Sequence, residues 1–274
     1  HLFFLLSGFG LAYSQMRKPL AYRAFIRRKF AKIYIPYAFV VILTAAISLL
    51  LPLFPTDGYA LAGHLLLFKM FDESIMSTYG YQFWFISTLF QFYLLFPLLY
   101  KVFERLSTPA WMLLIFLIGA AWIGLTLLWG EAENRVFNGA FFTYLWEFGL
   151  AIWLAKQTIK QQKFPHPPTS WLVVTAVVGL GVYAGIGLTG NPNWRAGNDL
   201  FALGGYTSLA WLLYRYGGAQ LRLLFGKLNQ WGYPLYLLHM LLLEAAKYLA
   251  GDRFNIGLAA FTLGVALVAA AQLE

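Results

Sequence analysis

Long apolar runs dominate this sequence, and most of them are long enough to cross a lipid bilayer. Eight lie near 33–54, 81–103, 110–129, 139–155, 171–189, 199–216, 231–250 and 255–271, and a shorter run opens the chain at 1–14. A transmembrane helix needs about 20 mostly apolar residues. The runs therefore predict an all-α, polytopic transmembrane helix bundle with about nine spans. We expect the apolar stretch 61–71, which contains His64 and Lys69, to lie at the membrane interface or to form a re-entrant segment.

The composition leads to the same class of protein. Hydrophobic residues make up 60% of the chain and charged residues 11%, and the mean hydropathy is +0.64. Soluble domains carry about 25% charged residues, so a 274-residue globule of this composition could not cover its surface with polar groups. The sequence contains no cysteine, which excludes disulfides, thiolate metal sites and cysteine nucleophiles.

The basic residues are distributed unevenly over the predicted loops. Of the 20 Lys and Arg residues, 15 fall on one side of the bundle, and the other side holds Lys69, Arg135, Arg195, Lys247 and Arg253. The positive-inside rule places the first set in the cytoplasm, which predicts a protein of the plasma membrane. A net charge of +9 would also suit a nucleic-acid-binding protein. Because the basic residues follow the side of the membrane instead of lining one groove, we do not expect nucleic acid as a partner.

A basic amphipathic stretch, FIRRKFAKIYIPY, occupies 25–37. Its cations are Arg27, Arg28, Lys29 and Lys32. Such a stretch is typical of a helix lying on the inner leaflet, and we expect it to end at Pro36, where the next span begins. One reading is anchoring to anionic lipid. The other is a phosphate site for a nucleotide or coenzyme A, because arginine grips phosphate through two parallel hydrogen bonds.

Polar side chains form a stripe along the run 81–103. Trp84, Ser87, Thr88 and Gln91 share one helical face, and polar groups are costly against lipid, so this face must meet protein or water. Hydrogen bonding between helices and the wall of a polar cavity both explain the stripe. Near the start of the chain, Ser7 and Gly8 are small residues of the type that lets two membrane helices approach closely.

One carboxyl group and one imidazole lie deep inside predicted spans. Glu147 and His239 each sit more than two turns from the nearest predicted membrane surface, and Tyr236 shares the helical face of His239. Either residue could serve proton chemistry, or be a hydrogen-bonded structural group. Glu244 is explained by an ion pair with Lys247. No histidine has a local ligand partner, and no P-loop, nucleophile elbow or dinucleotide fingerprint occurs, so we predict no metal site.

Five segments together resemble the membrane acyltransferase 3 family. In chain order they are LFFLLSGFGL, FIRRKFAKIYIPY, FWFISTLFQFYLLFPLL, WEFGLAIWLAK and YPLYLLHMLLL. The resemblance runs from residue 2 to about 245. It implies one integral-membrane domain over 1–274, of ten helices when intact, truncated at the N-terminus and possibly at the C-terminus. The family's first helix, with the histidine that acts as general base, should precede this sequence. His1 lies too close to the LFFLLSGF signature to take that role.

The resemblance also implies an activity. Members transfer an acyl group, often acetyl, from acyl-CoA to a hydroxyl of a cell-surface carbohydrate or similar acceptor, with no tightly bound cofactor. Applied to this sequence, Arg27, Arg28, Lys29 and Lys32 would hold the CoA phosphates. The acceptor side would be lined by Trp84, Ser87, Gln91, Tyr93 and Tyr236, with Glu147 and His239 as weak catalytic candidates. Many members carry Glu where this chain has Leu89, so either the acceptor differs from the commoner type or Gln91 or Glu147 supplies the polar contact. The alternative is a proton-coupled secondary transporter or flippase, although the sequence contains no evident inverted repeat.

Overall fold

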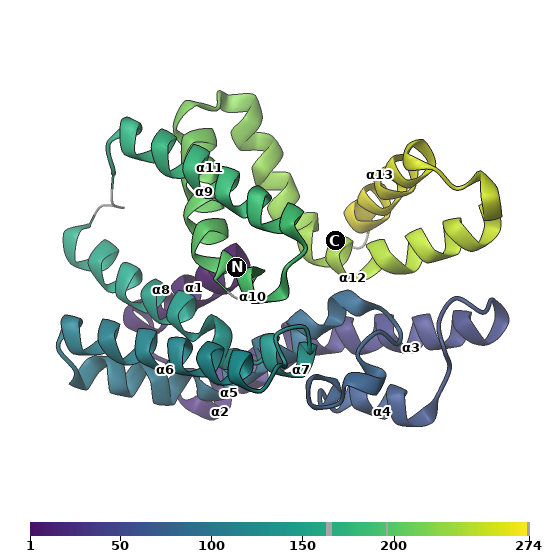
Figure 1. The fold of residues 1–274 in the computed structure, drawn as a ribbon, viewed down its shortest axis with the longest axis horizontal. Coiled ribbons are helices and arrows are strands. Elements are labelled where there is room, and N and C mark those ends of the chain that lie inside the picture. The colour runs from purple at the N-terminus through teal and green to yellow at the C-terminus, as the bar shows by residue number, and fades with distance from the viewer. Residues whose placement is uncertain (163–165, 196, 273–274) are drawn as a thin grey trace. The chain divides into compact units, whose positions relative to one another are not determined.

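The computed structural model describes residues 1–162, 166–195 and 197–272, and these residues form helices joined by turns with no strand among them (Figure 1). The all-α prediction is therefore confirmed. The helices are α1 Leu2–Arg17, α2 Tyr22–Lys29, α3 Ile35–Leu50, α4 Gly58–Leu65, α5 Trp84–Arg105, α6 Thr108–Leu128, α7 Arg135–Asn138, α8 Phe141–Gln161, α9 Thr169–Thr189, α10 Pro192–Arg195, α11 Asn198–Tyr216, α12 Ala219–Ala250 and α13 Ile256–Gln272.

Every predicted span overlaps one of these helices. In the described part of the chain, four helical stretches are long and apolar enough to cross a membrane: Tyr22–Leu50, Tyr81–Arg105, Thr108–Leu128 and Thr169–Thr189. Helix α13 is apolar but shorter. The integral-membrane character follows from these helices, while the total of nine spans stays a prediction.

The basic stretch does not end at Pro36, and that prediction is wrong. Helix α2 continues through a π-helical turn, Phe30–Tyr34, directly into α3, and Pro36 lies in the first turn of α3. Proline has no N–H to donate, and its ring collides with a preceding carbonyl in a regular helix. A π turn is wider than an α turn, so it accommodates the proline without breaking the helix.

The described chain divides into two compact units. Unit 1 comprises 1–25 and 88–217, and unit 2 comprises 26–87 and 218–274. The single domain expected over 1–274 stays a prediction.

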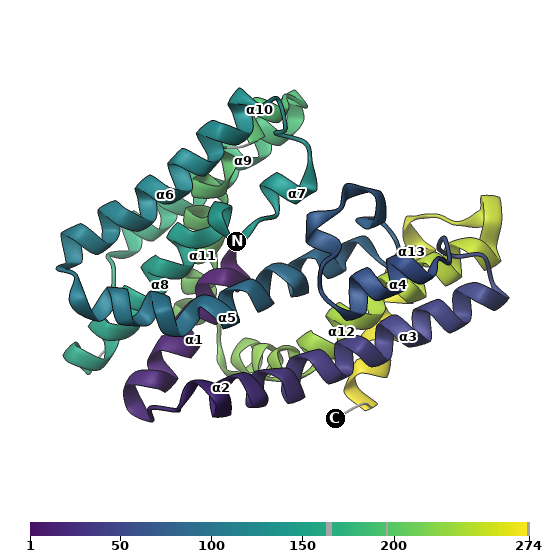
Figure 2. The same cartoon turned by 90° about the horizontal axis from the view of Figure 1, so that it is seen from below.

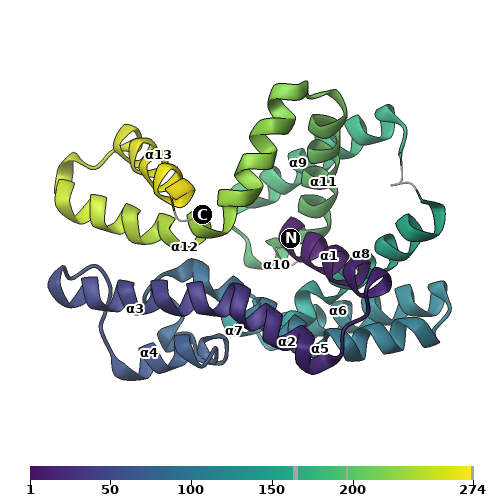
Figure 3. The same ribbon diagram turned by 180° about the vertical axis from the view of Figure 1, so that it is seen from behind.

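Unit 1 is built from helix pairs that touch through glycine. Helix α1 packs on α8 and helix α9 packs on α11 (Figure 3). At the second crossing, a Cβ atom on Gly179 would lie 2.7 Å from the backbone nitrogen of Gly205. A third pair, α6 and α8, is joined where the indole of Trp111 donates to the carbonyl of Gly149 at 3.0 Å. Small residues set these approaches because close backbone packing, not the hydrophobic effect, holds helices together in lipid.

Unit 2 contains a buried polar cluster between α3 and the 51–83 connection, near the contact of α3 with α4 that is visible in Figure 2. The hydroxyl of Tyr37 donates to the carbonyl of His64 at 3.0 Å, and Nε2 of His64 lies 3.2 Å from the hydroxyl of Thr78. Burial lowers the pKa of His64 to about 2, so this imidazole is neutral. Lys69 is fully buried beside it, and its ammonium donates to the carbonyl of Gly80 at 3.3 Å.

Candidate active site

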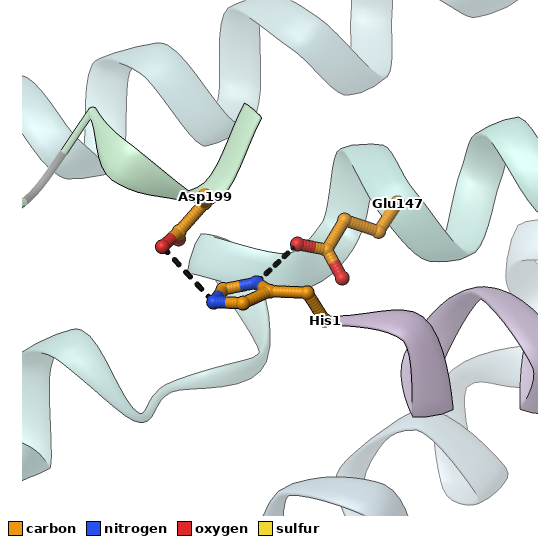
Figure 4. Close-up of side chains that lie close together, drawn as sticks. All are labelled: His1, Glu147 and Asp199. Carbon is orange, nitrogen blue, oxygen red and sulfur yellow. Dashed lines mark hydrogen bonds and ion pairs between the residues drawn. The ribbon is translucent and has the colours of Figure 1, made fainter. Parts of the chain in front are cut away.

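A histidine held between two carboxylates is the most distinctive polar arrangement in unit 1 (Figure 4). Nδ1 of His1 lies 2.7 Å from Oε1 of Glu147, and Nε2 of the same ring lies 3.1 Å from Oδ1 of Asp199. The three residues come from the start of α1, the middle of α8 and the first turn of α11. The fold therefore assembles the cluster from segments far apart in the sequence.

Aromatic and aliphatic packing positions His1 against α8. The ring of Phe4 stacks on that of Tyr144 with centroids 4.4 Å apart, and the His1 ring lies 5.5 Å from the Tyr144 ring. An apolar cluster of Leu5, Ala151 and Leu203 joins α1, α8 and α11 next to the polar groups. Because each of these three helices also carries one member of the polar cluster, this packing fixes where its side chains meet.

Asp199 is placed by the start of α11. Acidic residues are favoured in the first turn of a helix, where free backbone N–H groups point outward. The neighbouring Asn198 is buried, and its side-chain amide donates to the carbonyl of Tyr183 in α9 at 3.3 Å. The pairing of α9 with α11 thus holds the first turn of α11, and with it the carboxylate that faces His1.

The cluster requires two protons for its two contacts. A neutral imidazole has one N–H and an imidazolium has two. Either His1 is charged between two carboxylates, or it is neutral and one carboxyl group is protonated. The net charge of the three groups is −1 in both cases. One further proton would make the cluster neutral, so it is able to take up a proton from a substrate.

The two ends of the cluster differ in accessibility. The side chain of Glu147 is fully buried, whereas those of Asp199 and His1 are 18% and 25% exposed. The second oxygen of Glu147, Oε2, is buried and has no hydrogen-bond partner among the described residues. Asp199 is therefore the more exposed carboxylate of the cluster, while Glu147 forms the closed end.

The same three residues are of the types that bind metal ions, and one potential ligand atom from each lies within 4.8 Å of the other two. A metal ligand must offer a free lone pair. Both ring nitrogens of His1 already face a carboxylate oxygen at hydrogen-bonding distance, so neither is directed at a common central point. The geometry suits a hydrogen-bonded chain better than a metal centre.

The predicted polar stripe on α5 contributes hydrogen bonds between helices in unit 1. The hydroxyl of Thr88 donates to the carbonyl of Gly139 at 2.6 Å, and Oε1 of Gln91 accepts from the backbone N–H of Phe141 at 3.3 Å. These contacts anchor the start of α8, which has no side-chain cap of its own. Tyr93 is buried among aromatic rings of the same unit, including Phe25.

The remaining predicted site residues lie in unit 2. Ser87 is buried, and its hydroxyl has no partner in the described part of the chain. The hydroxyl of Tyr236 donates to the carbonyl of Gln82 at 2.5 Å. Nδ1 of His239 lies 2.8 Å from the carbonyl of Tyr236, on its own helix. Trp84 is partly exposed, as is Lys29, whereas the other predicted cofactor ligands, Arg27, Arg28 and Lys32, are exposed.

Sequence reasoning found Glu147 but missed its two partners. The sequence argues against His1 as the general base because it adjoins the LFFLLSGF signature, and it singles out no role for Asp199, the first residue of the run 199–216. Only the packing of α1 and α11 against α8 brings them to Glu147. The available signal was weak: each is a titratable residue at the very edge of an apolar run.

Comparison with known families fits this architecture. The model of a family described as an acyltransferase domain matches residues 1–272. No curated protein and no solved structure gives a significant match to the chain. With nearly the whole sequence covered by one family model, this helical membrane protein belongs to the membrane acyltransferase 3 family and is an acyltransferase.

Proposed function

We propose that this acyltransferase moves an acyl group, acetyl in the simplest case, from acyl-CoA to a hydroxyl of a cell-surface carbohydrate or a similar acceptor. The observation that carries the proposal is the contact between the buried Glu147 carboxylate and the His1 imidazole. Titratable groups hidden within a helical membrane unit are costly and mark functional sites. Ester formation from a thioester needs a group that removes the hydroxyl proton, and an imidazole bound to a carboxylate is such a group.

The donor side of the proposal rests on the basic stretch. Arg27, Arg28 and Lys32 are exposed along one continuous helix, and Lys29 lies between them. Guanidinium groups bind phosphate oxygens in pairs, so the four residues would hold the phosphates of CoA. The excess of basic residues in these loops supports a cytoplasmic donor side for an enzyme of the plasma membrane.

For the acceptor-binding part of the proposal, we retain the residues predicted from the sequence. We assign Trp84, Ser87, Gln91, Tyr93 and Tyr236 to contacts with the acceptor, because aromatic, hydroxyl and amide side chains suit a hydroxyl-rich ligand. Glu147 is supported as a site residue by its contact with His1. His239 is a weaker candidate for a catalytic role than Glu147, because its Nδ1 faces carbonyl groups of its own helix.

Neutralising the two arginines tests the donor site. Each charge-assisted contact with phosphate contributes about 1.5 kcal/mol or more. We therefore expect the double substitution Arg27→Gln and Arg28→Gln in the full-length protein to weaken acyl-CoA binding by about 100-fold or more. Equilibrium binding of labelled acetyl-CoA to the purified protein measures this.

The matched control is Arg253→Gln, which neutralises an exposed arginine in a loop predicted to lie on the opposite side of the membrane. It should leave acyl-CoA affinity unchanged. Equal affinity of the double variant and the wild type would refute the phosphate role of the basic stretch.

A proton-coupled transporter or flippase is the competing function, since buried groups such as Glu147 and His1 also serve proton coupling. The two functions differ in what they consume. A transporter moves its substrate without cleaving a thioester, whereas the acyltransferase releases one free CoA thiol for each ester formed. Thiol release that depends on an added hydroxyl acceptor supports transfer, and acceptor movement without thiol release supports transport.

A further inference from the structure

We infer that Asp199, His1 and Glu147 form a proton relay, with Asp199 receiving the acceptor's hydroxyl proton, His1 passing it inward and Glu147 holding it. The inference rests on the proposed acyl transfer and assigns its proton path to residues of this chain. It is carried by the two short contacts of one imidazole with carboxylates from different helices.

The direction of the relay follows from accessibility. Asp199 is the partly exposed carboxylate, and Glu147 is the fully buried one. A hydroxyl group can approach the first but not the second. The His1 ring lies between them, with one nitrogen facing each (Figure 4). Among the described residues, the imidazole is the group that lies within hydrogen-bonding distance of both carboxylates, so it provides the path from Asp199 to Glu147.

Glu147, the closed end of the relay, can bind one more proton. Oε1 of Glu147 faces Nδ1 of His1, but Oε2 has no hydrogen-bond partner among the described residues. A buried carboxylate oxygen without a donor is energetically costly. Protonating it removes the charge from the buried carboxylate and brings the three groups from a net charge of −1 to neutral. The arrangement therefore favours uptake of a proton during the reaction.

The step balances in atoms and charge. The hydroxyl O–H bond breaks and its proton enters the relay, while the oxygen forms a bond with the thioester carbonyl carbon. The C–S bond then breaks and the CoA thiolate leaves. The relay returns its extra proton to that thiolate, so the products are an ester and a free thiol, and the relay regains its starting state.

Other charged and titratable groups face the relay. Arg135, from α7, acts electrostatically on both His1 and Asp199. The phenol groups of Tyr144 in α8 and Tyr183 in α9 lie close to His1 and Asp199, respectively. The positive charge of Arg135 partly offsets the net negative charge of the resting relay.

Amide substitutions in the full-length protein test the relay. Asp199→Asn and Glu147→Gln keep the shape of each side chain but remove its ability to carry the proton. We expect each to lower the kcat of acceptor-dependent thiol release by about 100-fold or more, with acyl-CoA affinity unchanged. Asp199→Glu, which restores a carboxylate, should recover part of the rate.

Two readouts separate a relay from a structural role. Because the residues act as a unit, the double amide variant should be no slower than the slower single variant. The wild-type rate should fall on acidification, when the relay is already fully protonated, and this dependence should be absent in the variants. Glu244→Gln, at a partly exposed carboxylate in unit 2, is the control and should keep both the rate and the pH profile.

Any one of three results would overturn the relay. The first is a kcat close to that of the wild type in both single variants, and the second is an additive loss of kcat in the double variant. The third is a wild-type kcat that does not change from pH 5 to 8. The wild-type profile decides the matter even where a variant fails to fold. Failure of the proposed function looks different, because the wild type would then release no thiol in response to a hydroxyl acceptor.

Discussion

Replacing Gly8 with leucine is expected to separate α1 from α8 and to abolish acyl transfer. A Cβ atom at Gly8 would lie 2.8 Å from the backbone carbonyl oxygen of Phe148 and 3.1 Å from the Cβ atom of Ala151. Backbone atoms cannot relieve a clash by changing rotamer as a flexible side chain can, so the two helices must move apart. Overpacking of this kind costs about 3 kcal/mol. It would also pull His1 away from Glu147, one residue before Phe148 in α8.

A second glycine on the same helix supplies the control. Gly10 is exposed, and a Cβ atom built there meets nothing within 4 Å. Gly10→Leu should therefore retain the thermal unfolding midpoint and the thiol-release rate of the wild type, while Gly8→Leu loses both. Purified variants in the same detergent allow the comparison. Equal behaviour of the two variants would contradict the close α1–α8 crossing.

The helices of this protein could be predicted from hydropathy, because long apolar runs have few other stable forms in lipid. The expectation for Gly8 was also correct, since it touches the backbone of α8. The end of the basic helix was not predictable from Pro36. Whether a proline stops a helix depends on the geometry of the preceding turn, and here Phe30–Tyr34 widens.

The candidate site was only partly predictable, for a different physical reason. Glu147 stands out because a carboxylate inside an apolar run is expensive. His1 and Asp199 stand at the edges of such runs, where titratable residues are common and need no explanation. Their importance comes from long-range packing, which single-sequence patterns do not encode. The stripe from Thr88 to Gln91 had two possible readings, and the structure shows its contacts with the start of α8.

Replacing Lys69 with methionine is expected to raise thermal stability, and to raise it most at low pH. Lys69 is fully buried, and the carbonyl of Gly80 is the hydrogen-bond partner of its ammonium group. Burial lowers the pKa of Lys69 from 10.5 to about 7. The unfolded chain keeps this proton up to about pH 10. Below pH 7 the folded protein must bury the charge, at a cost of about 5 kcal/mol.

The sign of the pH dependence follows from these two pKa values. Between pH 7 and about 10 the unfolded state binds more protons at Lys69 than the folded state does, so raising the pH stabilises the wild type. Methionine fills similar volume without a charge and removes this dependence. The difference in unfolding midpoint between Lys69→Met and wild type should therefore be largest at pH 6 and should shrink steadily towards pH 9.5. Lys247→Met, at an exposed lysine, should show no such trend. A difference that is constant over this pH range, or a less stable Lys69→Met protein at pH 6, would mean that Lys69 is charged and compensated in the folded protein.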